Sequence, residues 1–249
     1  MPILLKRPEQ LRLMREAGRI VAETLDLLQE AVRPGITTGE LDRLAERHIR
    51  RRGAVPSFKG YRGFPASICV AVNDEVVHGI PGSRVLQEGD IIGIDIGARY
   101  RGFHGDATVT VPVGRISPDA ERLLRVCREA LAVGIGQARA GNRLTDISAA
   151  IQRHVEAAGF VVVRDLYGHG IGRALHEEPM LPHYGPAGQG PLLRPGMVLT
   201  IEPMIAAGKP DTRLLDDHWT IVTADGSLSA QFEHTVAITE DGPEILTLP

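Results

Sequence analysis

The chain has 249 residues, of which 43% are hydrophobic and 24% are charged, as in globular proteins large enough to bury a full core. Its formal net charge of -3 and its pI near 6.3 give no sign of nucleic acid or of an anionic membrane surface as a partner. No apolar run reaches membrane-spanning length, and the apolar stretch before Lys6 is too short for a signal peptide. We therefore expect a cytoplasmic protein without membrane contact.

The first predicted element lies in residues 33–54, a segment that the chain repeats without a gap in residues 139–160. Each segment carries apolar residues at helical spacing and stops at a glycine suited to end a helix, so both are predicted to be helices. His48 and His154 fall on the apolar stripes and are predicted to be core or boundary residues rather than ligands. The basic run Arg47–Arg52 is predicted to be a solvated helix face.

Three short stretches of the first half recur in the second, and each aligns a side chain that can bind metal or transfer protons. The aligned stretches are EGDIIGID (88–95) with PGMVLTIE (195–202), DATV (106–109) with EHTV (233–236), and HGIP (78–81) with HEEP (176–179). They pair Asp95 with Glu202, Asp106 with Glu233, and His78 with His176. Each half thus supplies two carboxylates and a histidine, and a two-fold arrangement would bring both sets to one cleft.

Asp95 and Asp106 flank a connection in which a hairpin centred near Tyr100–Arg101 would place them opposite each other on neighbouring strands. Two carboxylates buried side by side among apolar neighbours are costly unless a cation lies between them. Glu202 and Glu233 repeat this problem in the second half. One such acid could end a strand and face water, but four acids at matched places favour a metal site.

A third histidine, His169, lies in GHGIG at 168–172 and has no counterpart in the first half. Its glycines fit a backbone that turns tightly to aim one imidazole at the acids. Oxygen ligands with one imidazole suit divalent Mn, Fe, Co or Zn, and bridging carboxylates are typical of sites with two metal ions. The sequence therefore predicts a dinuclear centre.

Other catalytic motifs fail on spacing. GHGIGR lacks the lysine and the hydroxyl of a phosphate-binding loop and the spacing of a dinucleotide fingerprint. His183 comes too late after His176 for a zinc-binding HExxH helix, and no GxSxG elbow occurs. Cys69 and Cys127 have no CxxC spacing and are expected to be buried free thiols, which gives little support to a disulfide, a thiolate metal site or cysteine-protease chemistry.

Seven of these residues stand in motifs that together resemble the bacterial type I methionine aminopeptidases. They are His78 in VVHGIPG, Asp95 in IDIG, Asp106 in FHGDATV, His169 in GHGIG, His176 in HEEP, Glu202 in TIEPM and Glu233 in FEHTV. The resemblance implies an α+β pita-bread fold, in which two pseudo-symmetric halves of helices packed on antiparallel strands enclose a dinuclear site. We expect one catalytic domain over 1–249, with halves at about 10–115 and 116–245.

The resemblance also implies five ligands for two divalent metal ions (Co, Mn, Fe or Zn), namely Asp95, Asp106, His169, Glu202 and Glu233, with Asp106 and Glu233 bridging. A metal-bridged hydroxide would attack the first peptide carbonyl, with Glu202 as the proton acceptor. His176 would donate to the developing oxyanion, and His78 would contact the scissile amide nitrogen. Binding of the free α-amine to a metal would restrict cleavage to the N-terminal methionine.

Selection of methionine requires an apolar pocket, and aromatic side chains suit its sulfur. The resemblance places four residues in this pocket, Tyr61, Phe64, Cys69 and Trp219, although Phe64 could also be ordinary core. Phe58 stands where many relatives have a cysteine and Leu175 where many have a phenylalanine, which changes the shape of the pocket and leaves catalysis intact. The family prefers a small second residue, so Met1-Pro2 resembles a substrate and we expect this methionine to be removed.

The implied substrates are nascent polypeptides that begin with methionine. We expect a monomer that needs no nucleic acid and makes a transient ribosome contact through Arg47–Arg52. An aminopeptidase P or prolidase would share the ligands but usually adds a large N-terminal domain, and a creatinase-like hydrolase would lack the ligands. The alternative from a different class is a non-catalytic binding protein of the same fold, which missing ligands or basic tails would favour.

Overall fold

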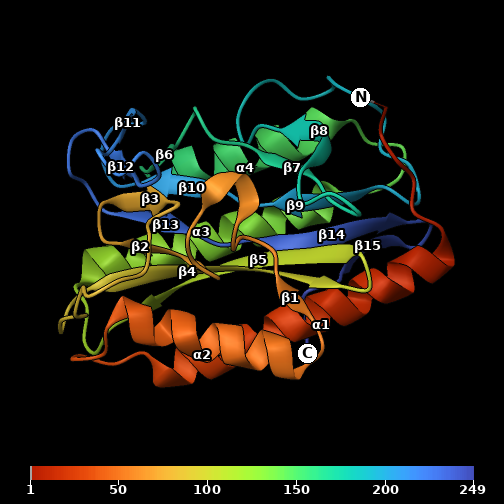
Figure 1. Ribbon diagram of the computed structural model, residues 1–249. Helices are drawn as coiled ribbons and strands as arrows, with labels where there is room; N and C mark the ends of the chain where they lie inside the picture. Colours follow the sequence, from red (N-terminus) through yellow and green to blue (C-terminus); the bar gives the residue numbers. More distant parts are fainter. Residues whose placement is uncertain (1) are drawn as a thin grey trace.

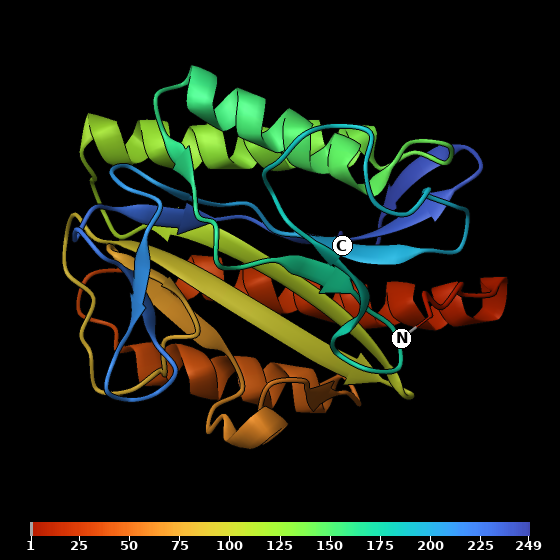
Figure 2. The same cartoon turned by 90° about the horizontal axis from the view of Figure 1, so that it is seen from above.

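The structure, a computed structural model, describes residues 2–249, so the expected removal of Met1 lies outside the described residues. Two pairs of helices lie on opposite sides of a central layer of strands (Figures 1 and 2). One side is covered by α1 (Pro8–Ala31) and α2 (Thr38–Arg51), and the other by α3 (Pro118–Gln137) and α4 (Leu144–Ala157). Among the helices of residues 2–249, none is both long and apolar enough to cross a membrane.

The two repeated segments form α2 and α4, as predicted, and each helix has 14 residues. Glu40 and Asp146 occupy the same place in the two helices, where each side chain accepts a hydrogen bond from the backbone N–H three residues earlier. Gly53 and Gly159 follow the helices with φ of 74° and 79°, a left-handed conformation in which glycine commonly ends a helix. The repeat in the sequence is therefore a repeat in the fold.

His48 and His154 lie at the edge of the core, which confirms the prediction that they are boundary residues. Both are half-buried, and each faces a glutamate of the neighbouring helix. Nε2 of His48 is 3.6 Å from Oε2 of Glu23, and Nε2 of His154 is 3.2 Å from Oε2 of Glu129. Neither histidine lines the pocket described below.

Each half contributes an antiparallel sheet to the central layer. In the first half, β4 (Ile91–Tyr100) pairs with three partners, β1 (Val55–Pro56), β2 (Cys69–Val72) and β5 (Phe103–Pro112). The sheet of the second half has the order β15 (Gly242–Ile245), β14 (His234–Thr239), β9 (Val198–Ile201), β7 (Gly168–Gly170) and β8 (Glu177–Leu181). Helices cover the outer face of this layer, so β4 and β9 are buried along most of their length.

Two smaller sheets stand at one end of the central layer (Figure 1). One has the order β13 (Ser229–Gln231), β10 (Met204–Ala206) and β6 (Val161–Val162). The other has the order β11 (Thr212–Leu214), β12 (Ile221–Thr223) and β3 (Glu75–Val77). A short 3-10 turn at Tyr61–Gly63 lies between β1 and β2 in the sequence.

The β4–β5 hairpin turns later in the sequence than predicted. Tyr100 pairs with Phe103, so the loop consists of Arg101 and Gly102 rather than being centred on Tyr100–Arg101. Arg101 has a φ of 47° and Gly102 a φ of 85°, and two positive φ angles are what a two-residue type I′ turn requires. The twist of this turn matches that of the strands, which explains why the chain accepts a left-handed arginine.

The later turn changes the pairing of the two acids on this hairpin. Asp95 lies opposite Thr108, and Asp106 lies opposite Gly97, so the acids are diagonal neighbours and not opposite each other as predicted. The register differs from the prediction by two residues, and side chains alternate between faces with a period of two. Asp95 and Asp106 therefore still share one face of the sheet.

The two halves meet along β5 and residues 231–235, where threonines make the contacts. Thr108 and Glu233 exchange two backbone hydrogen bonds of 3.4 and 2.9 Å. The Thr235 hydroxyl donates to the Asp106 carbonyl at 2.8 Å and accepts from the Asp106 N–H at 3.0 Å. The repeat aligns Asp106 with Glu233 and Thr108 with Thr235, so equivalent residues meet in both contacts, and each half brings one acid to the seam.

Candidate metal centre and its pocket

Every side chain that the sequence assigned to the site lines one pocket of about 200 Å³ at the seam. These residues are His78, His176, Glu202, Asp95, Asp106, His169, Glu233, Tyr61, Phe64, Cys69 and Trp219. Phe58 and Leu175 also line it, as do five residues that the sequence did not indicate, Arg62, Val77, Leu166, Tyr167 and Met204. Val77 and Met204 lie within the motifs VVHGIPG and TIEPM, whereas Arg62, Leu166 and Tyr167 carry no signal in the sequence.

Three acids form the centre of the pocket. Asp95, Asp106 and Glu233 each offer an oxygen, and these oxygens lie within 4.8 Å of one another. Burial raises the pKa of Asp95 to about 7, and burial together with neighbouring acids raises the pKa of Asp106 and of Glu233 well above the usual range. Oδ1 of Asp95 and Oδ1 of Asp106 are buried without a hydrogen-bond partner among residues 2–249. Such oxygens fit a divalent cation, which would satisfy and neutralise them.

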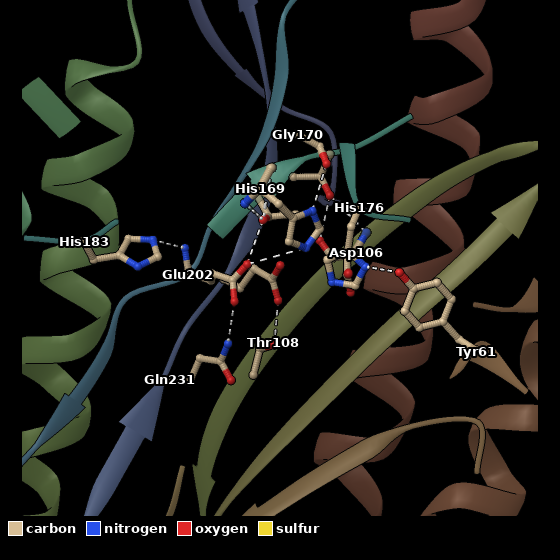
Figure 3. Close-up of polar contacts among 12 residues, drawn as sticks. Tyr61, Asp106, Thr108, His169, Gly170, His176, His183, Glu202 and Gln231 are labelled. Carbon is tan, nitrogen blue, oxygen red and sulfur yellow. Dashed lines mark hydrogen bonds and ion pairs between the residues drawn. The ribbon is translucent and has the colours of Figure 1, made fainter. Parts of the chain in front are cut away.

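His169 and Glu202 stand next to these acids (Figure 3). Nδ1 of His169 is 2.9 Å from the Gly170 carbonyl oxygen, which fixes the proton on Nδ1 and leaves Nε2 free. Nε2 is 3.7 Å from Oε1 of Glu202. Burial lowers the pKa of His169 to about 4, and burial raises the pKa of Glu202 to about 8. A neutral imidazole with a free Nε2 beside a carboxylate is a suitable donor set for a transition metal.

Hydrogen bonds from three neighbours hold Glu202 in place (Figure 3). The Thr200 hydroxyl donates to Oε1 at 2.7 Å, and the Gln231 amide donates to Oε2 at 3.3 Å. The backbone N–H of Glu202 donates to Nε2 of His183 at 3.1 Å. Sequence reasoning missed these supports, because His183 was tested only as a second zinc ligand and Thr200 had no chemical feature to distinguish it.

The glycines around His169 serve close packing rather than the tight turn that was predicted. His169 lies within strand β7, and Gly168 and Gly170 have ordinary negative or extended φ angles. A Cβ on Gly168 would clash with the Thr200 carbonyl, and a Cβ on Gly170 would clash with the Glu178 carbonyl. The backbones of β8 and β9 can approach His169 only because its neighbours have no side chains.

His176 and Tyr61 form a second group on the pocket wall (Figure 3). Nδ1 of His176 is 2.8 Å from the Tyr61 hydroxyl, and the two rings are stacked with centroids 5.2 Å apart. The ring of His169 lies 4.1 Å from that of His176. Burial, followed by the charges of His169 and Arg62, lowers the pKa of His176. His176 is therefore neutral at pH 7.

His78 reaches the pocket from a strained backbone. Its φ of 61° is left-handed, a conformation that costs a residue other than glycine on the order of 1–3 kcal/mol. The following residue, Gly79, accepts a hydrogen bond from the Val70 N–H at 3.0 Å, and a Cβ on Gly79 would clash with the Val70 carbonyl. This close approach to β2 turns the chain so that His78 faces the acids.

The remaining wall is apolar and aromatic. Phe64 and Trp219 meet edge to face with centroids 5.0 Å apart. Cys69, Phe58 and Leu175 are buried beside them in the same cluster. Cys69 is a free thiol, as expected, and burial with nearby acids raises its pKa well above the usual value. The wall can therefore surround an uncharged, flexible side chain.

Known proteins resemble the chain over nearly its full length. The pattern of metallopeptidase family M24 matches residues 12–240. Methionine aminopeptidase 1 from Bacillus subtilis (strain 168) is 58% identical over 245 residues, which cover 98% of this chain and 99% of the relative. The crystal structure of methionine aminopeptidase from Thermotoga maritima superposes with a TM-score of 0.98, at 45% identity and with 100% of both chains covered.

A more distant likeness concerns the fold alone. The prolidase from Pyrococcus furiosus superposes with a TM-score of 0.81 at 23% identity, over 98% of this chain and 65% of the prolidase. The expected α+β pita-bread architecture is thereby confirmed. The prolidase is the longer protein, since the superposition covers 65% of it.

Proposed function

Because the chain belongs to metallopeptidase family M24, we propose a separate role for each group of side chains in its pocket in the removal of N-terminal methionine. The chain is a metal-dependent hydrolase that removes N-terminal methionine, the activity for which its full-length relatives are named. The observation that carries the residue roles is the pocket itself, in which buried acids lie beside neutral histidines and an aromatic wall.

The proposed metal ligands are Asp95, Asp106, His169, Glu202 and Glu233, with Asp106 and Glu233 shared between two ions. Divalent ions held there lower the pKa of water and polarise a carbonyl oxygen. Co, Mn, Fe and Zn all accept a set of carboxylates with one imidazole. The unpartnered oxygens of Asp95 and Asp106 and the free Nε2 of His169 support this assignment.

Glu202 is proposed to accept the proton of the attacking water. Its carboxylate lies at the edge of the acid group, and Thr200 and Gln231 hold both of its oxygens. A carboxylate fixed in this way keeps its geometry when it takes up a proton, which favours general base catalysis. His183 holds the backbone of the same residue.

His176 is proposed to stabilise the oxyanion that forms at the first peptide carbonyl. We assign the Tyr61 hydroxyl, 2.8 Å from Nδ1, as the donor of this hydrogen bond, which places the proton of the neutral ring on Nε2. This Nε2–H can donate to an oxygen that gains negative charge, and a preorganised donor of this kind strengthens its interaction in the transition state. Tyr61 thus selects the tautomer that His176 needs.

His78 is proposed to contact the scissile amide nitrogen and to assist its protonation. It lines the pocket, and the repeat aligns it with His176. Burial lowers the pKa of His78. A neutral imidazole can donate or accept, which suits a group near a departing amine. The strained backbone at His78 supports this role, since strain persists where function requires a particular direction.

The aromatic wall is proposed to bind the methionine side chain. Phe64 and Trp219 present ring edges, Cys69 adds a polarizable sulfur, and Tyr61 closes the wall near His176. Contacts between sulfur and aromatic rings are favourable, and a flexible thioether adapts to an irregular cavity. A preference for a small second residue accompanies this proposal.

Residues 1–249 are proposed to act as one catalytic domain. The half at about 10–115 supplies Asp95 and Asp106, and the half at about 116–245 supplies the other three ligands, so neither half holds the site alone. The setting that we propose is a cytosolic monomer that acts on nascent chains. The exposed arginines of the run Arg47–Arg52 would touch the ribosome, and charge reversal there with unchanged ribosome co-sedimentation would remove that part of the proposal.

The test is methionine release from Met-Ala-Ser and Met-Leu-Ser peptides, by chelator-treated protein before and after addition of Mn or Co. We expect metal-dependent release from the first peptide and little from the second. Asp106→Asn serves as the control, because it removes a proposed bridging ligand without changing side-chain size. A folded wild-type protein that releases no methionine with either metal would point instead to a non-catalytic binding protein.

A further inference from the structure

His176 stands between an irregular segment and a strand. Residues 171–176 have no regular secondary structure, and β8 begins at the next residue, Glu177. The ring of His176 contacts Tyr61 and His169, but those contacts require that the ring already points into the pocket. Its direction is therefore set by the chain on either side.

A buried ion pair lies directly behind His176. Nζ of Lys6 donates to Oε2 of Glu177 at 2.6 Å and to the Leu4 carbonyl at 3.1 Å. The two side chains are 5% and 8% exposed. Lysine and glutamate are rarely buried to this degree unless they are paired, and loss of one partner leaves an uncompensated charge. The pair thus ties Glu177 to a segment that lies 171 positions away in the sequence.

The irregular segment is shaped around this pair. Oε1 of Glu177 accepts a hydrogen bond from the Ala174 N–H at 3.2 Å, which closes the turn that ends at His176. A Cβ on Gly172 would clash with both the Lys6 side chain and the Glu177 carboxylate. The glycine at this position is therefore explained by the room that the ion pair needs.

Lys6 itself is anchored to the sheet that carries Glu202. Its backbone N–H donates to the Gly196 carbonyl at 2.7 Å, shortly before β9. Figure 1 shows the N-terminal segment running from the start of α1 across to the side where β8 lies. The segment thus links α1 of the first half to the strands of the second half.

Glu177 and His176 act on opposite sides of the chain. His176 lines the pocket whereas Glu177 does not, and the Glu177 carboxylate instead meets Nζ of Lys6 at 2.6 Å. The ion pair consequently holds the backbone from behind while the imidazole faces the substrate.

We propose that Lys6 and Glu177 are positioning residues that fix the direction of His176. The proposal rests on the proposed role of His176 in oxyanion stabilisation. Because the pair does not touch the aromatic wall or the acids, its loss affects turnover more than substrate binding or metal uptake.

The main test is Lys6→Met, which keeps the length of the side chain and removes its charge. We expect kcat on Met-Ala-Ser to fall roughly 10- to 100-fold, because a displacement of about 1 Å suffices for such a loss, with KM and metal uptake within about twofold of wild type. Lys6→Arg should restore most of the activity. Arg15→Met is the matched control, since it removes an exposed ion pair with Glu244 in the helix that follows Lys6 and should leave kcat unchanged.

A second readout does not depend on activity. In ¹⁵N-labelled metal-free protein, His176 should show one neutral tautomer, protonated on Nε2, and Lys6→Met should show exchange between tautomers. If wild type and Arg15→Met both fail to release methionine, the proposed function is wrong, and these spectra still test the positioning.

Folding of the variants is controlled separately. The double variant Lys6→Met/Glu177→Met replaces the buried pair by apolar side chains, which proteins often tolerate. If it folds with a low kcat and tautomer exchange, the positioning role is supported; a wild-type kcat overturns it. If neither Met variant folds, Glu177→Gln tests the proposal, because it removes only a charge. An unchanged kcat with an unchanged His176 spectrum in this variant would overturn the proposal.

Discussion

Replacement of Asp95 by Asn should stabilise the metal-free protein while destroying its metal site. Burial raises the pKa of Asp95 from its ordinary 3.8 to about 7. Between these pH values the unfolded chain has released a proton that the folded protein retains, so stability is fully present below about pH 4 and is lost as the pH rises to about 7. Asn keeps the shape of the side chain and removes this penalty, together with one charge near Asp106 and Glu233.

The size of the effect follows from the pKa. One pKa unit corresponds to about 1.4 kcal/mol, so the penalty at Asp95 reaches about 4 kcal/mol above pH 7, of which about 3 kcal/mol develops between pH 5 and pH 8. This is an upper bound, because the neighbouring acids share their protons with Asp95. At about 2–4 °C per kcal/mol for a chain of this size, the gap in Tm between variant and wild type should widen by at most about 6–12 °C.

The assay is thermal unfolding after dialysis against a chelator, at pH 5 and at pH 8, with Glu240→Gln as a control at an exposed acid outside the site. Addition of Mn should then raise the Tm of wild type but not that of Asp95→Asn. At a hundredfold excess of Mn over Kd, binding stabilises the folded wild type by about 2.7 kcal/mol. The reasoning is refuted if metal-free Asp95→Asn is less stable than wild type at pH 8, or if the gap does not grow with pH.

Four further substitutions test three positions of the pocket and its support. Thr200→Val removes the 2.7 Å hydrogen bond to Glu202 and the 2.9 Å hydrogen bond from the His169 N–H, and it should lower kcat roughly 10-fold with an unchanged circular dichroism spectrum. Trp219→Ala removes the edge contact with Phe64 and should raise KM for Met-Ala-Ser roughly 10-fold with little change in kcat, as measured by steady-state kinetics. His78→Asn should lose activity but keep its stability because Asn tolerates a left-handed φ, whereas His78→Val should also lose about 1–3 kcal/mol in urea unfolding.

The positions of the acids could be predicted from the sequence because they interrupt an apolar pattern. Asp95 and Asp106 interrupt β-rich runs whose other residues are apolar, and such an interruption is visible without a structure. The repeat then indicated Glu202 and Glu233, whose sequence surroundings are less regular. It also fixed α2 and α4, since helical periodicity and a terminal glycine are local signals.

The features that the sequence did not carry depend on contacts between distant segments. The predicted hairpin turn was misplaced because no pattern in the sequence indicated that Arg101 would take a left-handed φ. The glycines beside His169 suggested a tight turn, but they are explained by strands that approach from elsewhere in the chain. No pattern in the sequence indicated that Lys6 is buried, because its partner Glu177 lies in a distant segment.

The two halves share a fold but differ in the contacts that equivalent side chains make, and this difference matters for the chemistry. Thr108 and Thr235 are equivalent in the repeat, yet the Thr108 hydroxyl donates to the Glu233 carboxylate at 2.7 Å, whereas the Thr235 hydroxyl donates to the backbone carbonyl of Asp106. Glutamate is one methylene longer than aspartate and reaches the hydroxyl of the other half. Asp106 does not, so its Oδ1 stays without a protein partner. A symmetric frame with Asp in one half and Glu in the other thus produces unequal acids, and His169 from one half alone makes the two sides of the centre more unequal still.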